Sequence, residues 1–253
     1  MSVCRRKLMM AYAANLGRGD IVYPGLIAAW SAKGKTNKDA DRNVLKDLTG
    51  NGHDITLNNF AWNTESGYNN PKYPEALVFD GVDDYGVNES LPSLTDYTVI
   101  SKIYWITSPN DSVYAYGKAK EDNYPNGIVF SSYSSIGRDV SHLFNFGMDN
   151  SNNNVKSYVN PIINYHNTKV FNGTPINKGD AVDDNCPFCL GRIWATHNGL
   201  CNMAFYSFYL FNRTLTDEEI KSFIRKYIDS EYLLPSEQYL VLNQGKLNIN
   251  KLK

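Results

Sequence analysis

The chain has 253 residues and a mass of 28.6 kDa, enough for one large domain with a substantial core or for two small ones. Its formal net charge is -1 at pH 7 and no block of basic residues runs through it, so nothing indicates a nucleic-acid surface. Aromatic residues make up 13% of the chain and include 18 tyrosines, a content that suits both β-strands and binding surfaces.

The first twenty residues, MSVCRRKLMMAYAANLGRGD, differ in character from the rest of the chain. Three basic residues at positions 5–7 precede an apolar run at 8–14, which resembles a secretory signal. That run has only seven residues and contains Tyr12, so it lies at the lower limit for such signals. We therefore expect residues 1–20 to form a short arm that docks against a partner. No later stretch is long and apolar enough to cross a membrane.

Short apolar runs separated by turn residues occupy most of the remaining chain. They are rich in β-branched and aromatic residues, and Gly, Asn, Asp or Pro bounds each of them. The runs are residues 25–30, 75–81, 97–106, 127–133, 141–148, 187–194 and 203–213. Many short strands with turns between them predict a β-sandwich or a barrel.

Residues 216–228 have a different period. Thr216 and Glu219 have the spacing of a capping box, which marks the start of a helix. Apolar residues then recur on one helical face: Ile220, Phe223, Ile224, Tyr227 and Ile228. The pattern predicts a short amphipathic helix packed on the sandwich, with a tail at 231–253 after it.

Three segments occur in an order that resembles a known family. They are LKDLTGNGHDITLNN (45–59), ALVFDGVDDYGVN (76–88) and YLFNRTLTDEEIKSFI (209–224). Together they resemble the hallmark segments of the LamG-like jelly-roll family, in the concanavalin A-like lectin/glucanase superfamily. The resemblance covers residues 21–228. It implies an all-β fold, an antiparallel jelly-roll β-sandwich with one short C-terminal amphipathic helix, in a domain at 21–230. It also implies a binding or adhesion module.

The aspartates of the second segment allow two interpretations. In the family this segment is a structural signature, with a tight turn at Asp80 and Gly81, and short Asp side chains suit turns. Alternatively, Asp83 and Asp84 help to bind calcium, which takes six to eight oxygen ligands. Asp47 in the first segment has the same two interpretations. Where family members commonly carry an acidic pair before the third segment, this chain has Tyr206 and Ser207.

The cysteines suggest a second metal site. Cys186, Cys189, His197 and Cys201 have the spacing C-x2-C-x7-H-x3-C, which supplies four ligands for tetrahedral zinc. Two alternatives stay open: a disulfide in an oxidising compartment, or a core position for Cys189.

The sequence predicts no catalytic site. The glucanases of the superfamily place acidic residues alternately on one strand, and no such triplet occurs here. A non-catalytic module that binds a glycan or a protein surface fits better. Sugar sites commonly stack an aromatic ring on the sugar, and the ring candidates in polar loops are Trp62, Tyr68 and Tyr165. The alternative for each is packing on the edge of the sandwich.

A structural subunit of a larger particle is the second functional hypothesis. The arm at 1–20 and the long first hallmark are similar to tail or fibre proteins from phages and prophages of Bacteroidetes. That resemblance implies a virion or an extracellular, cell-surface location. It also implies homo-oligomer or virion partners that bind through the arm.

Overall fold

A computed structural model of the chain describes residues 21–92, 94, 97–106, 114–118, 128–131, 142–149, 154–160, 176–177, 186–192 and 200–228. The structural findings concern these residues. The predicted arm and tail, Tyr165 and His197 lie outside them. Within them, no helix is long and apolar enough to span a membrane.

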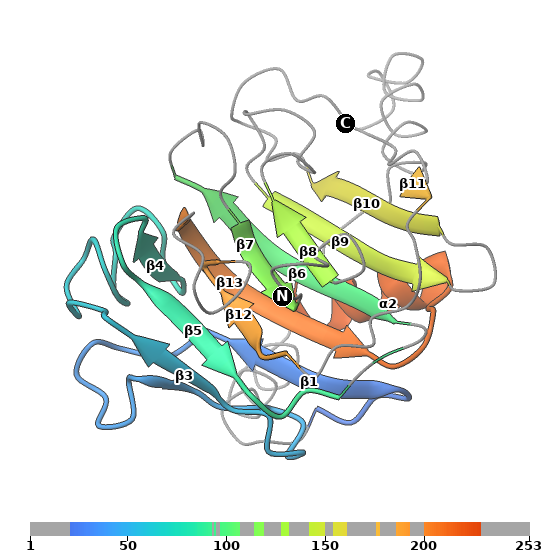
Figure 1. Ribbon diagram of the computed structural model, residues 1–253, viewed down its shortest axis with the longest axis horizontal. Helices are drawn as coiled ribbons and strands as arrows, with labels where there is room; N and C mark the ends of the chain where they lie inside the picture. Colours follow the sequence, from blue (N-terminus) through green and yellow to red (C-terminus); the bar gives the residue numbers. More distant parts are fainter. Residues whose placement is uncertain are drawn as a thin grey trace, which may run out of the picture.

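Two antiparallel sheets contain all the strands of the described residues (Figure 1). The first sheet has the order β1-β13-β6-β9-β10-β11, and β4 also pairs with β13. Its strands are β1 (Leu26–Ser31), β4 (Leu77–Asp80), β6 (Thr98–Trp105), β9 (His142–Asp149), β10 (Asn154–Asn160), β11 (Ile176–Asn177) and β13 (Asn202–Phe211).

The second sheet has the order β2-β3-β5-β12-β7-β8. Its strands are β2 (Val44–Leu45), β3 (Ile55–Asn58), β5 (Tyr85–Asn88), β7 (Tyr114–Lys118), β8 (Ile128–Ser131) and β12 (Phe188–Leu190). The protein is therefore an all-β sandwich, as predicted, and each of the seven predicted runs overlaps a strand.

The main core lies between the two sheets, and Trp30 of β1 is at its centre. Its ring packs against Phe188 of the second sheet at 5.3 Å between centroids and against Phe208 of the first at 5.1 Å. The indole N–H donates to the His53 carbonyl at 2.7 Å, so the polar atom of this fully buried side chain is satisfied. Burial of an aromatic residue of this size stabilises the fold by about 3–5 kcal/mol relative to alanine.

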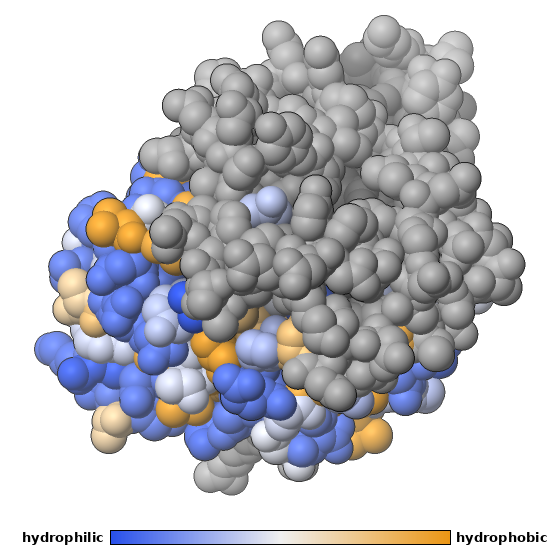
Figure 2. All heavy atoms as spheres, in the orientation of Figure 1, coloured by the Kyte–Doolittle hydropathy of each residue, from blue (hydrophilic) through white to orange (hydrophobic). Residues whose placement is uncertain are grey.

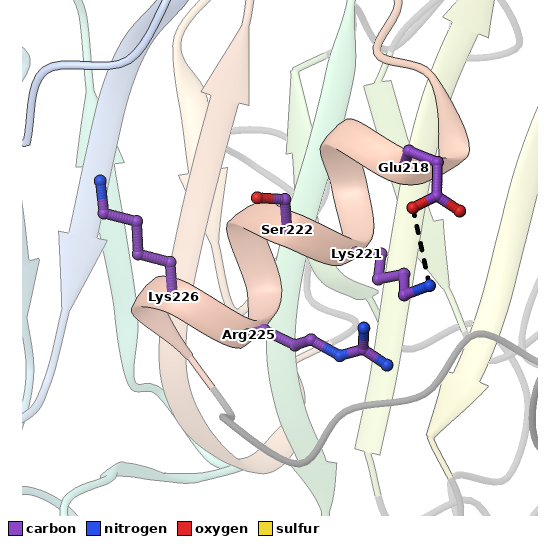
Figure 3. A pocket seen from close by; sticks show the side chains of 5 residues that line it. All are labelled: Glu218, Lys221, Ser222, Arg225 and Lys226. Atoms are coloured by element: carbon purple, nitrogen blue, oxygen red, sulfur yellow. Dashed lines mark ion pairs between the residues drawn. The ribbon is translucent and has the colours of Figure 1, made fainter.

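A second core separates the first sheet from the helix α2 (Asp217–Tyr227). Phe223 of α2 is fully buried and makes edge contacts with Tyr209 and Phe211 of β13. The opposite face of α2 carries charged groups beside a hollow of about 370 Å³ (Figure 3). The residues that line the hollow are Glu218, Lys221, Ser222, Arg225 and Lys226.

The start of α2 shows what the third hallmark segment does in the fold. The Thr216 side chain accepts from the Glu219 N–H, and the Glu219 carboxylate accepts from the Thr216 N–H, as the predicted capping box requires. Arg213 donates to both Glu219 oxygens at 2.7 and 3.2 Å, which lowers the pKa of Glu219 to about 2. Arg213 also donates to the Pro24 carbonyl at 3.2 Å, so it joins the helix start to the entry of β1.

Candidate functional site

One end of the sandwich brings two connections together, on the left in Figure 1. Residues 59–75 make up the loop between β3 and β4 except for Ala76, and residues 81–84 form the turn between β4 and β5. The Asn59 side chain donates to the Asp83 carbonyl at 3.1 Å, and the Ser66 hydroxyl donates to Asp84. We call these two connections, together with Tyr85 and Arg192 beside them, the loop-end site.

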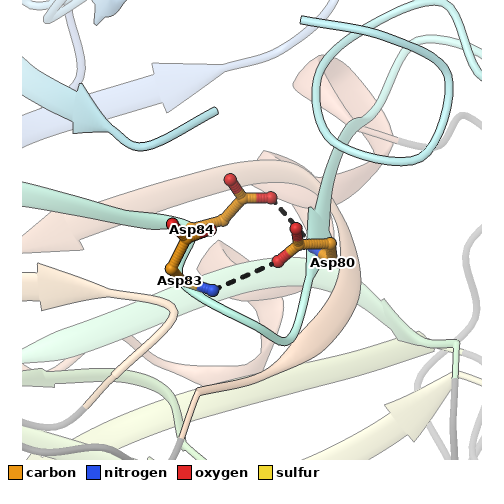
Figure 4. A group of neighbouring side chains, drawn as sticks. All are labelled: Asp80, Asp83 and Asp84. Carbon is orange, nitrogen blue, oxygen red and sulfur yellow. Dashed lines mark hydrogen bonds between the residues drawn. The ribbon is translucent and has the colours of Figure 1, made fainter. Parts of the chain in front are cut away.

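The acidic turn is held by its own aspartates (Figure 4). Asp80 Oδ1 accepts from the Val82 N–H at 2.7 Å and from the Asp83 N–H at 3.4 Å. Gly81 has φ +78°, and a Cβ there would lie 3.0 Å from Asn202 Cβ, so both conformation and space require glycine. The interpretation of this segment as a structural turn is confirmed.

Asp84 is fully buried and joins the turn to the loop. Its Oδ1 accepts from Ser66 Oγ at 2.9 Å, and its Oδ2 accepts from the Asp80 N–H at 2.9 Å. Burial raises the pKa of Asp84 to about 7, and the two hydrogen bonds only partly oppose that rise.

Three carboxylates of this turn lie close enough to share a cation. Asp80, Asp83 and Asp84 each offer one oxygen, and these oxygens lie within 4.8 Å of one another. The group contains two of the three predicted calcium ligands and adds Asp80, which was not predicted as a ligand. Calcium takes six to eight oxygens, and both oxygens of Asp84 already accept hydrogen bonds.

Asp47 does not belong to this group, so the structure does not bring it together with Asp83 and Asp84 as a shared ligand. It is buried, and its carboxylate accepts from the backbone N–H groups of Ala29, Thr49 and His53. A carboxylate with this many local donors organises the first hallmark segment as a turn.

The aromatic residues of the loop pack on one another. Trp62 is partly exposed, and its ring stacks on Phe60 at 5.2 Å and on Tyr68 at 5.9 Å, with the Arg42 guanidinium 5.5 Å above it. Tyr68 is fully buried. The structure therefore corrects the prediction that Tyr68 stacks on a sugar, because its ring belongs to the core. Trp62 offers a ligand only the part of its ring that these neighbours leave open.

Asn37 lies in the long connection between β1 and β2, and its side chain binds the backbone of the loop. Its side chain accepts from the Tyr68 N–H at 2.6 Å and donates to the Tyr68 carbonyl at 2.7 Å. It also donates to the Asn63 carbonyl at 3.1 Å. One side chain thus satisfies three backbone groups of the loop and fixes its path.

The loop stores backbone strain. Among the described residues, every non-glycine residue with positive φ lies in it: Asn59, Trp62, Asn69 and Glu75, with φ between 56° and 68°. For Trp62, with φ +56°, this conformation is a genuine outlier. Each such residue costs about 1–3 kcal/mol and persists only where its surroundings determine it, which is common at binding sites.

The described cysteines do not come together. Cys189 lies between Phe188 and Leu190, whose side chains face the core, so alternation along β12 directs Cys189 to the other face. Cys201 is fully buried in the core between the sheets. Cys186, Cys189 and Cys201 therefore do not form one group of ligands among the described residues, and the predicted zinc site with His197 stays a prediction. No disulfide joins any two of the three, so that alternative is not realised among the described cysteines.

Sequence reasoning missed a second feature of this end. Arg192, just after β12, lies flat on the ring of Tyr85, with its guanidinium carbon 3.3 Å from the ring centroid. The two residues are 107 positions apart, and only the pairing of β12 with β5 brings them together. No pattern in the sequence indicates this contact.

No family model matches the chain, and no curated protein matches it. Solved structures do resemble it. The binding domain of Paraclostridial Mosquitocidal Protein 1 has a TM-score of 0.50 and 12% identity, over 80% of this chain and 52% of that one. Domain 4 of AbnA, a GH43 extracellular arabinanase from Geobacillus stearothermophilus in complex with arabinotriose, has a TM-score of 0.49 and 18% identity, over 78% and 97% of the two chains.

Trypanosoma rangeli sialidase in complex with sialic acid has a TM-score of 0.48 and 14% identity, and the match covers 89% of this chain but 38% of the sialidase. The chain thus spans well under two thirds of the sialidase and about half of the mosquitocidal structure. At 12% identity, the likeness to the mosquitocidal binding domain shows a similar fold and nothing more.

Proposed function

We propose that the protein is a non-catalytic binding module that recognises a glycan at the loop-end site. The observation that carries the proposal is the strained loop 59–75, in which Trp62 is held in a left-handed conformation by ring packing and by Asn37. A surface fixed in this way before the ligand arrives loses little conformational entropy on binding.

The groups that the loop-end site exposes suit a sugar. Four amide or carboxylate residues are exposed in the two connections of this site, and such side chains supply both donors and acceptors for hydroxyl groups. They are Asn59, Asn63, Asn69 and Asp83. In Figure 2 the described part of the visible face is mostly hydrophilic, with apolar residues in small separate groups. A polar ligand fits this surface better than an apolar one.

A catalytic role has less support. A glycosidase needs two carboxylates that reach the scissile bond, one of them protonated. Asp84 has the raised pKa of such an acid, but its side chain is buried and both of its oxygens bond the protein. The raised pKa is therefore a consequence of its structural position.

Membership of the LamG-like family is part of the proposal. It is supported by the way the three hallmark segments are used: Asp47, Asp84 and Arg213 each organise a turn or a helix start that the fold needs. The similar structures include a binding domain and an arabinanase domain in complex with arabinotriose, which agrees with a glycan-binding use of such a sandwich.

We place the module in a virion or at a cell surface. This setting is supported by the resemblance of residues 1–20 to the starts of phage and prophage tail or fibre proteins. Virion proteins or further copies of the chain would then bind through that arm. Mass determination in solution, with and without residues 1–20, tests the assembly.

Binding of the purified full chain to a broad glycan array, with and without calcium, tests the function. The informative variant is Trp62→Gly, because glycine keeps the left-handed backbone and removes only the ring. We expect it to weaken binding about tenfold, since aromatic contact contributes on the order of 1 kcal/mol or more to such sites. Ser222→Ala, on the far side of the sandwich, is the control and keeps full binding.

Two results would count against the proposal. The first is no glycan bound in either buffer. The second is binding that Trp62→Gly leaves unchanged, which would show that the glycan binds elsewhere on the protein. A silent array together with an oligomer that dissociates on removal of residues 1–20 would favour a purely structural subunit.

A further inference from the structure

Arg192 has an unusual environment for a charged side chain. It is half-buried, its guanidinium lies flat on Tyr85, and it hydrogen-bonds the Cys189 thiol. Its Nε atom is buried and makes no hydrogen bond. A guanidinium has five N–H donors, and the acceptor that the described residues give it is a thiol, which is a weak one.

The positive charge of Arg192 also has no counterion in the described part of the chain. Among the described residues, no carboxylate lies within ion-pair distance of it. Arg213 provides the contrast within the same chain, because both of its terminal nitrogens bind Glu219. Taking a charge partly out of water without a partner is costly, so an arginine kept in this state indicates an anion that is bound in the working protein.

The position of Arg192 is suited to a ligand of the loop-end site. Tyr85 follows Asp84 directly and pairs in register with Asn58, the residue before the strained loop. Asn58 is partly exposed and supplies an amide on the same strand pair. Stacking on Tyr85 fixes the plane of the guanidinium, so its fork is oriented before a ligand arrives.

We infer that Arg192 binds the carboxylate of an acidic sugar, such as a uronic or sialic acid residue of the glycan. This inference rests on the proposed function and names its ligand class. A guanidinium fork matches a carboxylate in two parallel hydrogen bonds, which is the geometry that a stacked arginine presents. Asn58 and the amide side chains of the loop then form hydrogen bonds with the hydroxyl groups of the sugar.

The test compares matched ligands. Binding of oligogalacturonate and of sialyllactose is measured by calorimetry against methyl-esterified oligogalacturonate and lactose, with a sulfated disaccharide as a further probe. We expect an acidic sugar to bind at least about tenfold more tightly than its neutral counterpart, and Arg192→Gln to remove that difference. Arg225→Gln makes the same change of charge on α2 and keeps the preference.

Arg192→Lys separates charge from geometry. It retains the cation but loses the planar fork, so we expect it to lose most of the preference as well. Thermal unfolding of each variant shows that it is folded.

The outcomes separate this inference from the proposed function. Neutral and acidic glycans bound equally, with Arg192→Gln unchanged, would overturn the inference and leave glycan binding standing. Preference for the sulfated probe over carboxylates would overturn the assignment to a sugar acid. If no probe and no array glycan binds, both fail.

Discussion

Asp84 accepts a hydrogen bond from Ser66 Oγ at 2.9 Å in the interior of the loop-end site. This contact joins the acidic turn to the strained loop, and the second oxygen of Asp84 continues the connection to the Asp80 N–H. One buried carboxylate thus determines how the two connections lie against each other.

The first prediction concerns stability. Asp84→Ala leaves the buried Ser66 hydroxyl and the partly buried Asp80 N–H without their acceptor, at a cost of about 1–3 kcal/mol for a buried group and less for a partly buried one. We expect the free energy of unfolding to fall by about 2–4 kcal/mol, measured by denaturant titration. Asp83→Ala, at an exposed position in the same turn, is the control and changes it by less than about 0.5 kcal/mol. Equal losses for the two variants would contradict the role given to Asp84.

The second prediction is a dependence on pH. Burial raises the pKa of Asp84 from 3.8 to about 7 in the folded protein, so between these pH values the native state holds a proton that the unfolded chain lacks. The contribution of Asp84 to stability therefore falls as the pH rises from about 4 to about 7, by an amount up to about 4 kcal/mol.

Subtraction of the Asp84→Asn curve isolates this contribution, because asparagine does not titrate. Glu219, with its pKa lowered to about 2, contributes stability that is present above its ordinary value of 4.5 and is lost as the pH falls through 2. That effect overlaps only the acidic edge of the window, and the subtraction removes it because it is common to both proteins. If the difference in unfolding free energy between the wild type and Asp84→Asn stayed constant from pH 4 to 7, a raised pKa for Asp84 would be excluded.

The third prediction compares two glycines with the same backbone conformation. Gly191 has φ +85°, and a Cβ there would lie 2.8 Å from the Phe79 ring and 3.1 Å from the Asp84 carbonyl. Gly34 has φ +79° and open space around it. Gly34→Ala should cost only the conformational penalty of about 1 kcal/mol, and Gly191→Ala about 1–3 kcal/mol more for the clash. If the two variants lost the same amount of stability in thermal unfolding, the Phe79 ring would have moved aside to make room for the methyl group at position 191.

The strands could be predicted because their signal is local. Residues 203–213 are apolar and aromatic, bounded by turn residues, and form β13 at Asn202–Phe211. Strand β7 was missed, since YAYGK at 114–118 contains a glycine and a lysine that match no strand pattern. Lys118 is nevertheless buried, with its amino group 2.6 Å from the Cys186 carbonyl. The two residues are 68 positions apart, so no local sequence pattern indicates the contact.

The candidate site was predictable only in part for the same reason. The turn at Asp80 and Gly81 follows from residue types, whereas the contact between Asn37 and Tyr68 and the stacking of Arg192 on Tyr85 depend on chain segments that meet only after folding. Trp62 was selected as an aromatic in a polar loop, and nothing in that pattern indicates that three neighbours cover its ring.

The last prediction concerns the cysteines and tests the zinc hypothesis directly. Cys189 and Cys201 are fully buried, and burial raises the pKa of Cys189 to about 11 and that of Cys201 in the same direction. The reactive thiolate is therefore scarce as well as inaccessible. We expect iodoacetamide to leave both residues unmodified in the native protein and to modify them fully in denaturant, as read by peptide mass spectrometry.

A zinc chelator distinguishes burial from metal protection. If burial in the fold protects these thiols, the chelator changes neither their labelling nor the thermal unfolding temperature. If Cys186, Cys189 and Cys201 became reactive together after chelation, the predicted site with His197 would be restored. Cys201 would then have to leave the core between the sheets, where it now packs, so the unfolding temperature would fall as well.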